Sequence, residues 1–270
     1  MNRLYSLGHL TALSCPPPEL VRIAAAAGYD FVSPRIIPFG EPSYDLAKDK
    51  AMLRATKSAL ADTGLSVLDV ELARILPDLD PETYVPAFEA AAELGAKYMT
   101  SSIWTPDAGF AAATLARMCE LATSCGLAIC IEYLPFVPIA AFTDQLDIIR
   151  KADRSNCGLL VDAMFTGPNG IDFADLATLP ANLIHYVQLC DGPKQLPPLG
   201  TPSMFEVVRG GRLYLGEGEI DLPGLLARLP PVPCSLEVPH AGRIAELGAL
   251  EHARRSLAAA RRFAAAHPEL

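Results

Sequence analysis

Short apolar runs alternate with longer amphipathic stretches along the whole chain. The apolar runs resemble buried strands and cover residues 5–10, 29–35, 66–74, 97–104, 127–134, 158–164, 184–190 and 234–239. The amphipathic stretches are rich in Ala and Leu, resemble helices, and cover residues 18–28, 46–64, 81–96 and 110–126. Several of these stretches end at glycine, which commonly ends a helix. This alternation predicts βαβ units and a parallel sheet.

The ends of the apolar runs follow one another at a nearly constant spacing. Intervals of 30, 31, 30 and 26 residues separate, in order, Glu71, Ser101, Glu132, Asp162 and Gln188. A βαβ unit takes about 30 residues. Eight runs in 270 residues therefore predict one α/β domain over residues 1–270, a single (β/α)₈ TIM barrel, whose usual length is about 250 residues. A doubly wound open sheet is the alternative, but that fold calls for a G-x-G-x-x-G turn, which the chain lacks.

One interval breaks this rhythm. Gln188 and Glu237 are 49 residues apart, and the excess falls in a Pro- and Gly-rich segment at about 191–219. Loops longer than about 12–15 residues usually serve as lids or binding loops. The sequence therefore predicts an active-site loop in this segment.

Composition limits the partners of the chain. A hydrophobic content of 51% can form a substantial core, and a net charge of −9 disfavours nucleic-acid binding, which needs Lys and Arg to neutralise phosphates. No apolar stretch approaches the about 18–20 residues of a membrane span, and the first fifteen residues lack the long apolar region of a signal peptide. We therefore expect a cytoplasmic protein with a small-molecule substrate and neither nucleic-acid nor membrane partners.

The seven cysteines are scattered, without a C-x-x-C pair, which argues against a disulfide framework and against a zinc–thiolate site. Cys190 is the one candidate for a catalytic thiol, but Asp191 follows it, and an adjacent carboxylate raises a thiol's pKa and so lowers its reactivity. A role as a small buried hydrophobic residue is favoured.

Four consecutive apolar runs carry an oxygen-bearing side chain at or near their ends, in the order Glu132, Asp162, Gln188 and Glu237, and Asp191 follows shortly after the third. A barrel brings the carboxyl ends of its strands to one mouth. Each such residue alone is equally well explained by a hydrogen bond or an ion pair. Together they favour a divalent cation, and all-oxygen ligation favours Mg²⁺ or Mn²⁺ over Zn²⁺.

These segments resemble a known family. Nearly the whole chain is similar to the xylose isomerase-like TIM barrels, and specifically to the sugar phosphate isomerase/epimerase group; the similar segments are GLSVLDVELARI, GLAICIEYLPF, GLLVDA, HYVQLCDGP, RLYLGEGEIDLPGLLARL and SLEVP. The resemblance implies a metal site of Glu, Asp, His and Glu on the last four strands. Those positions are Glu132, Asp162, Gln188 and Glu237 here, and the two glutamates are also implied as acid/base groups. Arg212 matches a substrate-contacting arginine before a Gly-x-Gly turn.

Two departures from the family pattern stand out. Gln188 replaces the usual histidine ligand and offers a neutral, weaker carbonyl oxygen. Phe165 stands where a second, substrate-contacting histidine is common, three residues after Asp162. The loss of that polar contact counts against a ketose 3-epimerase.

Further residues near the predicted strand ends are candidates for substrate binding, although each has a structural alternative. The candidates are Glu71, Arg35, His9, His240 and Trp104. An ion pair with each other is the safer interpretation of Glu71 and Arg74. A lone histidine is more often a hydrogen-bonded structural residue, and an aromatic residue more often packs in the core.

The resemblance implies a divalent-metal-dependent isomerase or epimerase that acts on a small sugar-like hydroxy-carbonyl compound by proton transfer through an enediolate. Arg212 and Arg35 would then hold a distal hydroxyl or carboxylate. A dehydratase of the 3-dehydroshikimate or inosose type would use the same residues, and a barrel that binds a sugar or a metal without turnover is the third alternative. Members of the group often self-associate, so a homo-oligomer is expected by analogy alone.

Overall fold

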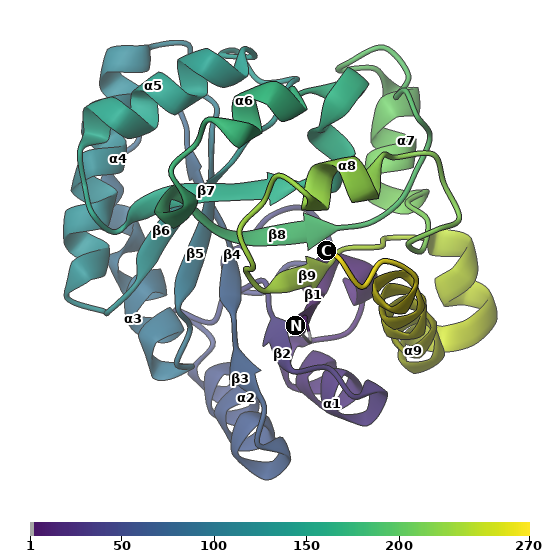
Figure 1. The fold of residues 1–270 in the computed structure, drawn as a ribbon. Helices are drawn as coiled ribbons and strands as arrows, with labels where there is room; N and C mark the ends of the chain where they lie inside the picture. Colours follow the sequence, from purple (N-terminus) through teal and green to yellow (C-terminus); the bar gives the residue numbers. More distant parts are fainter. Residues whose placement is uncertain (1–2) are drawn as a thin grey trace.

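A computed structural model describes residues 3–270 and shows a barrel of parallel strands with helices around it (Figure 1). The strands are β1 (Tyr5–Gly8), β2 (Phe31–Ser33), β3 (Ser66–Val67), β4 (Asp69–Ile75), β5 (Tyr98–Ile103), β6 (Ala128–Glu132), β7 (Cys157–Asp162), β8 (Ile184–Leu189) and β9 (Cys234–Leu236). Their order in the sheet is β3-β2-β1-β9-β8-β7-β6-β5-β4. The two edge strands, β3 and β4, follow one another directly along the chain, and a bridge joins Arg35 to Glu71. The sheet therefore closes, and the predicted α/β TIM barrel is confirmed.

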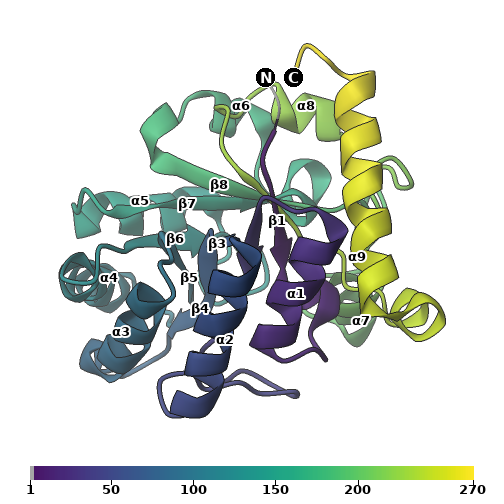
Figure 2. The same cartoon turned by 90° about the horizontal axis from the view of Figure 1, so that it is seen from below.

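Helices connect successive strands and cover the outside of the barrel (Figure 2). They are α1 (Pro17–Ala27), α2 (Lys50–Thr63), α3 (Val85–Glu93), α4 (Ala108–Thr123), α5 (Phe142–Ala152), α6 (Phe173–Ala177), α7 (Pro202–Gly210), α8 (Leu222–Leu226) and α9 (Ala241–Ala266), which is broken at Gly248. Short 3₁₀ turns are η1 (His9–Ala12), η2 (Pro81–Tyr84), η3 (Ala163–Phe165), η4 (Gly167–Asn169) and η5 (Ala181–Leu183). Aspartates begin several helices by accepting a backbone N–H, as Asp49 and Asp107 do, and Gly28 and Gly64 end α1 and α2 in the left-handed conformation.

The strands separate two apolar clusters because alternate side chains point inward and outward. The larger cluster lies between strands and helices, and the smaller one comprises Leu68, Cys130, Leu160 and Tyr186. Tyr186 on β8 shares a hydrogen bond with Thr100 on β5, and these strands are not neighbours in the sheet, so the two side chains meet inside the barrel.

A polar layer crosses this interior below the barrel mouth. Asp69 is fully buried and accepts hydrogen bonds from Ser33 and, at 3.2 Å, from Thr100, while Ser33 is 2.7 Å from the hydroxyl of Ser6. Burial, and next the neighbouring carboxylate of Glu71, raises the pKa of Asp69 to about 7, although the two hydroxyl donors oppose the shift. The barrel interior is thus held by side-chain hydrogen bonds as well as by apolar packing.

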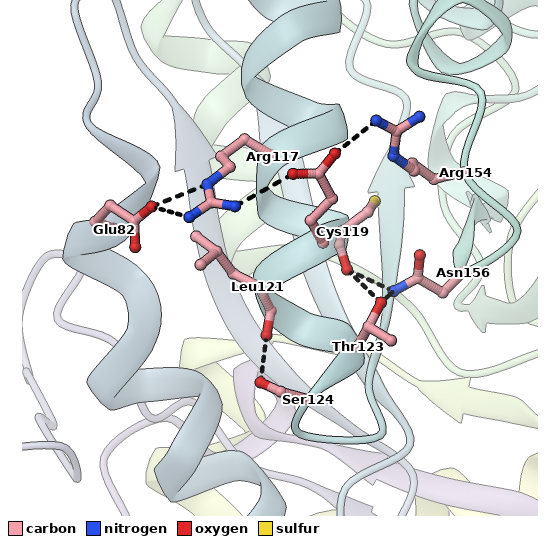
Figure 3. Close-up of polar contacts among 9 residues, drawn as sticks. Glu82, Arg117, Cys119, Leu121, Thr123, Ser124, Arg154 and Asn156 are labelled. Atoms are coloured by element: carbon pink, nitrogen blue, oxygen red, sulfur yellow. Dashed lines mark hydrogen bonds and ion pairs between the residues drawn. The ribbon is translucent and has the colours of Figure 1, made fainter.

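A surface network of ion pairs ties α4 to its neighbours (Figure 3). Arg117 on α4 pairs with Glu82 of η2 and with Glu120, and Glu120 in turn pairs with Arg154 at 2.6 Å. The amide of Asn156 donates to two backbone carbonyls, including that of Leu127 at 3.0 Å. The charged groups are about half exposed, so solvent screens these pairs and each contributes little to stability. This network orders the outer shell and lies apart from the barrel mouth.

The segment expected as a long loop at about 191–219 contains a helix, α7, which runs from Pro202 to Gly210. Thr201 caps its first turn, and Met204 and Val208 are buried beneath it, so local capping and an apolar face overcame the Pro- and Gly-rich composition. The description of this segment as loop throughout was therefore wrong.

The two ends of the described chain lie close together in both views (Figures 1 and 2), and Arg3 and Leu270 line one cavity. Arg3 directly precedes β1, so this cavity lies at the amino ends of the strands, opposite the barrel mouth. Within residues 3–270, none of the helices combines the length and the apolar character that a membrane span requires.

Candidate functional site

The four oxygen-bearing side chains predicted at strand ends come together at the barrel mouth. Asp162 and Gln188 face one another as register partners on β7 and β8, and Glu132 ends β6, the neighbour of β7. Glu237 directly follows β9, and its backbone N–H donates to Leu189 of β8 at 3.0 Å. Parallel pairing of four adjacent strands therefore places all four side chains at one edge.

A pocket of about 360 Å³ opens at this mouth, within the range of small-molecule sites. Seven of the predicted site residues line it, namely Arg35, Glu71, Trp104, Glu132, Gln188, Arg212 and Glu237. Asp162 lies just behind this lining, in contact with Arg212. In the part of the chain that the structure describes, His9 and His240 are absent from the lining.

Arg212 reaches the centre of the carboxylates from the segment after α7. Its Nη1 lies 2.9 Å from Asp162 Oδ2 and 3.8 Å from Glu237 Oε2, and its Nε donates to the carbonyl of Val208 at 2.8 Å. The side chain is fully buried, with 2% exposed. One guanidinium thus faces three buried or half-buried carboxylates, since Glu132 also lines this pocket.

The electrostatics of the pocket follow from this imbalance. Burial, and next the Asp162 carboxylate, raises the pKa of Glu132 to about 8, although Arg212 opposes the shift. Burial, and next the Glu71 carboxylate, also raises the pKa of Glu237 well above its usual range. Burial alone would lower the pKa of Arg212, but the surrounding acidic groups outweigh it and raise that pKa. The protein's own positive charge therefore balances only part of the negative charge gathered here.

The donor set fits a hard divalent cation. It consists of three carboxylates and one amide oxygen, and the oxygen Gln188 Oε1 is buried without a hydrogen-bond partner within residues 3–270. An unpartnered buried oxygen is costly unless a ligand or ion meets it. Across the same described residues, no three His, Cys, Asp or Glu side chains are already arranged to hold a metal ion. Arg212 instead contacts two of the carboxylates, Asp162 and Glu237.

Glu71 forms a buried ion pair with Arg35, whose Nη2 lies 3.1 Å from Glu71 Oε2, and not with Arg74 as the sequence alternative had it. Both residues line the pocket. Trp104 lines the same pocket, with its indole N–H donating to Ser102 at 2.9 Å and its ring 6.2 Å from that of Phe136.

The structure does not bring the two candidate histidines into the pocket. His9 is fully buried, its Nε2 is 2.8 Å from the Cys15 carbonyl, and its Nδ1 accepts the N–H of Arg35 at 2.7 Å. Burial lowers the pKa of His9 to about 4, which keeps the ring neutral for this acceptor role. His240 begins α9 and accepts the N–H of Arg243 at 3.3 Å. In this structure both histidines therefore support the backbone and do not line the pocket.

Asp191 also takes a structural position and not a ligand position. Its carboxylate accepts the backbone N–H groups of Gly192, Gly216 and Ile220 at 2.9–3.2 Å. It therefore holds the segment that carries Arg212 against the end of β8. Burial raises the pKa of the neighbouring Cys190 thiol to about 12, which agrees with an unreactive buried residue.

Several pocket residues were not predicted from the sequence. The added lining residues that matter below are Phe39, Thr100, Ser102, Phe136 and Arg209. The period of two along a strand offered a signal for Ser102, because Thr100 and Ser102 share the inner face of β5. No sequence signal pointed to Phe39 or Arg209, which come from a loop and from α7.

The family model described as xylose isomerase-like TIM barrel matches residues 21–263. A curated relative, 3-dehydroshikimate dehydratase from Pseudomonas aeruginosa, is 33% identical over 129 residues, which cover 46% of this chain and 20% of the relative. The chain thus spans about a fifth of the length of the curated relative that it matches.

Solved structures share the fold. A fusion protein of a xylose isomerase-like TIM barrel and a 4-hydroxyphenylpyruvate dioxygenase superposes with a TM-score of 0.80 at 22% identity, over 96% of this chain and 42% of that one. The IolI protein with a bound zinc atom gives 0.77 at 17% identity, over 95% and 96%. D-allulose 3-epimerase from Methylomonas sp. gives 0.69 at 18% identity, over 97% and 98%. Identities this low establish the fold alone, whereas the family model spans most of the sequence. The chain belongs to the xylose isomerase-like TIM barrel family.

Proposed function

We propose that this chain is an enzyme that removes a proton from the carbon next to a carbonyl group in a small polyhydroxylated compound. The observation that carries the proposal is the pair Glu132 and Glu237, two carboxylates with raised pKa values on the outer two of four adjacent strands, in one pocket. Such carboxylates are suited to take and return protons near neutral pH.

The proposal includes a divalent cation, Mn²⁺ or Mg²⁺ in preference to Zn²⁺, held by Glu132, Asp162, Gln188 and Glu237. When bound, such a cation would draw charge from the substrate's carbonyl oxygen and make the adjacent C–H more acidic. The unpartnered oxygen of Gln188 and the excess of carboxylates over Arg212 support this assignment. The fold relative IolI was solved with a bound zinc atom, which supports a cation in this chain without selecting the ion.

The protein's own residues would divide the remaining work. Glu132 and Glu237 would move the proton, and Arg212 would hold the Asp162 carboxylate in place and offer its remaining N–H groups to a substrate oxygen. Aromatic side chains on one wall, Trp104 and Phe136, would keep bulk water from the reacting carbon. The segment 191–219 would serve as the active-site loop, because it carries Arg209 and Arg212 to the pocket.

Loss of water after proton removal is the outcome that we favour, as in a dehydratase of the 3-dehydroshikimate type. The sequence match to the Pseudomonas dehydratase supports it, and so does Phe165, which offers no polar contact where epimerases of the group commonly have a histidine. The second candidate is an isomerase or epimerase, which would return the proton to the substrate. The shared fold of D-allulose 3-epimerase supports that candidate.

Dialysis against a chelator is expected to abolish activity, and readdition of Mn²⁺ or Mg²⁺ is expected to restore it, because proton removal relies on the cation. Two assays run side by side: formation of an aromatic product from 3-dehydroshikimate, followed by ultraviolet absorbance, and exchange of deuterium from solvent into D-allulose and D-fructose, followed by NMR. Aromatic product identifies the dehydratase, and exchange alone identifies the isomerase or epimerase. Turnover that survives chelation unchanged would contradict the proposed requirement for a metal ion. The absence of turnover in both assays would contradict the proposal that the chain is an enzyme for these substrates.

Gly8→Ala is expected to lower kcat by about 10- to 100-fold, the effect of a misplacement near 1 Å in an active site. Gly8 ends β1 in an ordinary extended conformation, and a Cβ there would lie 2.7 Å from Glu237 Cγ, so the Glu237 side chain must shift. Steady-state kinetics and a thermal melt measure the two effects separately. Gly242→Ala is the matched control, because its Cβ would meet nothing closer than 3.6 Å. An unchanged kcat in Gly8→Ala would show that the position of Glu237 is not critical.

A further inference from the structure

Three guanidinium groups surround the ring of Phe39, which lines the pocket together with Arg35 and Arg209, whereas Arg74 contacts the ring without being part of the lining. The ring of Phe39 lies 4.5 Å from the guanidinium carbon of Arg74, 5.5 Å from that of Arg35 and 5.8 Å from that of Arg209. These residues come from the loop after β2, the end of β4 and the helix α7, so three separate segments converge here. We call Phe39, Arg35, Arg74 and Arg209 the arginine cluster.

The backbones of two of these arginines are held in place by hydrogen bonds to side chains. The N–H of Arg35 donates to His9 Nδ1 at 2.7 Å, and His9 stacks on Tyr44 with a centroid distance of 5.2 Å. The hydroxyl of Tyr84 accepts the N–H of Arg74 at 2.8 Å and donates to its carbonyl at 3.0 Å. These hydrogen bonds fix the backbone positions of the two arginines, which lowers the conformational entropy that is lost when a ligand binds.

The positive charge of the arginine cluster is only partly neutralised. Glu71 pairs with Arg35, but Arg35 Nε stays buried without a hydrogen-bond partner among residues 3–270. Over the same residues, Arg74 and Arg209 have no carboxylate within 4.0 Å. The exposed Glu41 is the one further acidic residue at this outer end of the lining. A local excess of positive charge in a chain of net charge −9 calls for an anionic partner.

An aromatic wall completes the pocket. The Phe136 ring makes edge contacts with Trp104 at 6.2 Å and with Phe165 at 5.6 Å, and all three residues line the same pocket as Arg35 and Arg209. The inner end of the pocket carries the proposed proton-transfer carboxylates, Glu132 and Glu237. A ligand that fits all these features has an anionic end, a flat apolar face and oxygen atoms at its opposite end.

From this arrangement, we infer that the arginine cluster is a subsite for the carboxylate of the substrate, and that the substrate class is the cyclic hydroxy-keto carboxylates. The inference rests on the proposed function for the position of the reacting end. The planar fork of Arg matches the two oxygens of a carboxylate, and the face of Phe39 keeps the guanidiniums side by side despite their mutual repulsion. A neutral ketose would leave the positive charge of the arginine cluster without an anionic partner.

The test compares two probes that differ only in charge, 3,4-dihydroxybenzoate and its neutral amide, 3,4-dihydroxybenzamide. Trp104 is the single tryptophan of the chain and lines the pocket, so its fluorescence reports binding of both. The wild type is expected to bind the benzoate at least about 10-fold more tightly than the benzamide. The double variant Arg74→Gln/Arg209→Gln is expected to lose that preference and to keep its affinity for the benzamide, since charged hydrogen bonds of this kind account for about a 10-fold factor or more.

Arg228→Gln is the matched control. Arg228 also lies over an aromatic ring, at 5.6 Å from the Phe173 centroid, but it does not line this pocket. Any of three results would overturn the subsite. The wild type could bind both probes with equal affinity, the double variant could lose affinity for both probes equally, or Arg228→Gln could lose the preference for the benzoate. If inorganic phosphate displaces the benzoate more readily than acetate does, the subsite binds a phosphoryl group and the assignment to a carboxylate is wrong.

The same titration in Glu132→Gln separates this inference from the proposed function. A preference for the benzoate that persists in Glu132→Gln supports the subsite independently of turnover, whereas wild-type turnover in Glu132→Gln contradicts only the proton-transfer chemistry. Turnover of 3-dehydroshikimate that is unaffected in Arg74→Gln/Arg209→Gln contradicts the subsite and leaves the proton-transfer chemistry standing.

Discussion

Glu237→Gln is expected to lower kcat/KM by about 10²- to 10⁴-fold, the usual contribution of a general acid or base. Gln keeps the size of the side chain and one carbonyl oxygen but can neither take up nor release a proton near neutral pH. Glu132→Gln is expected to show a loss of the same order, because the two carboxylates flank the same pocket. The double variant is expected to lose little more than the worse single variant, since groups that act as a unit are not additive. Steady-state kinetics with saturating Mn²⁺ measure all three.

Glu206→Gln is the control, since this exposed glutamate on α7 lies outside the pocket lining. Metal content of each variant is measured in parallel, because both glutamates are also proposed ligands. A Glu237→Gln enzyme that binds metal normally and retains wild-type kcat/KM would remove Glu237 from the chemistry. Additive losses in the double variant would indicate two independent roles.

Arg212→Met is expected to lower the free energy of unfolding of the metal-free protein by about 3–5 kcal/mol at pH 8, because it leaves buried carboxylates without their cation. Met approximates the length and apolar volume of the lost side chain but carries no charge. The loss is expected to be smaller at pH 5. The pKa of Glu132, raised to about 8, means that this group is protonated there and no longer needs a positive neighbour. Urea denaturation at both pH values measures the difference.

Arg212→Lys separates charge from geometry, since Lys keeps the charge but loses the Nε contact to the Val208 carbonyl. It is expected to fall between the wild type and Arg212→Met. Mn²⁺ is expected to restore part of the stability of Arg212→Met, because a bound cation stabilises the folded state by mass action. An Arg212→Met protein as stable as the wild type at pH 8 would show that Arg212 does not compensate the buried acids.

The relative positions of Glu132, Asp162 and Gln188 could be predicted from the sequence, because parallel strands of equal spacing must end at the same edge. The predicted edge is the one that the structure shows, with Asp162 and Gln188 as direct register partners. Regular βαβ connections carry this information, since the repeat length and the inward-facing alternation are both local properties of the chain.

The contacts of Arg212 and the arginine cluster could not be predicted in the same way. Arg212 lies after α7, in a segment whose path depends on the three backbone amides that Asp191 holds. Arg74 and Arg209 meet at Phe39 although 135 residues separate them in the sequence. Long-range contacts between irregular segments leave no period in the sequence. His9 was misplaced for a related reason, because a histidine near a strand end can face the pocket or turn back to the backbone.

The adjacent chain ends, at the floor of the barrel, have an architectural consequence. Additional sequence joined at Arg3 or at Leu270 would leave the barrel on the side away from the pocket, since both residues line a cavity at the amino ends of the strands. A second domain attached there need not obstruct substrate entry or strain the strand ends that carry Glu132 and Glu237. The fold relative in which such a barrel is fused to a dioxygenase has more than half of its length outside the region that matches this chain. In this chain the two ends and the pocket lie on opposite faces of the barrel, so a group joined to either end would leave the pocket open.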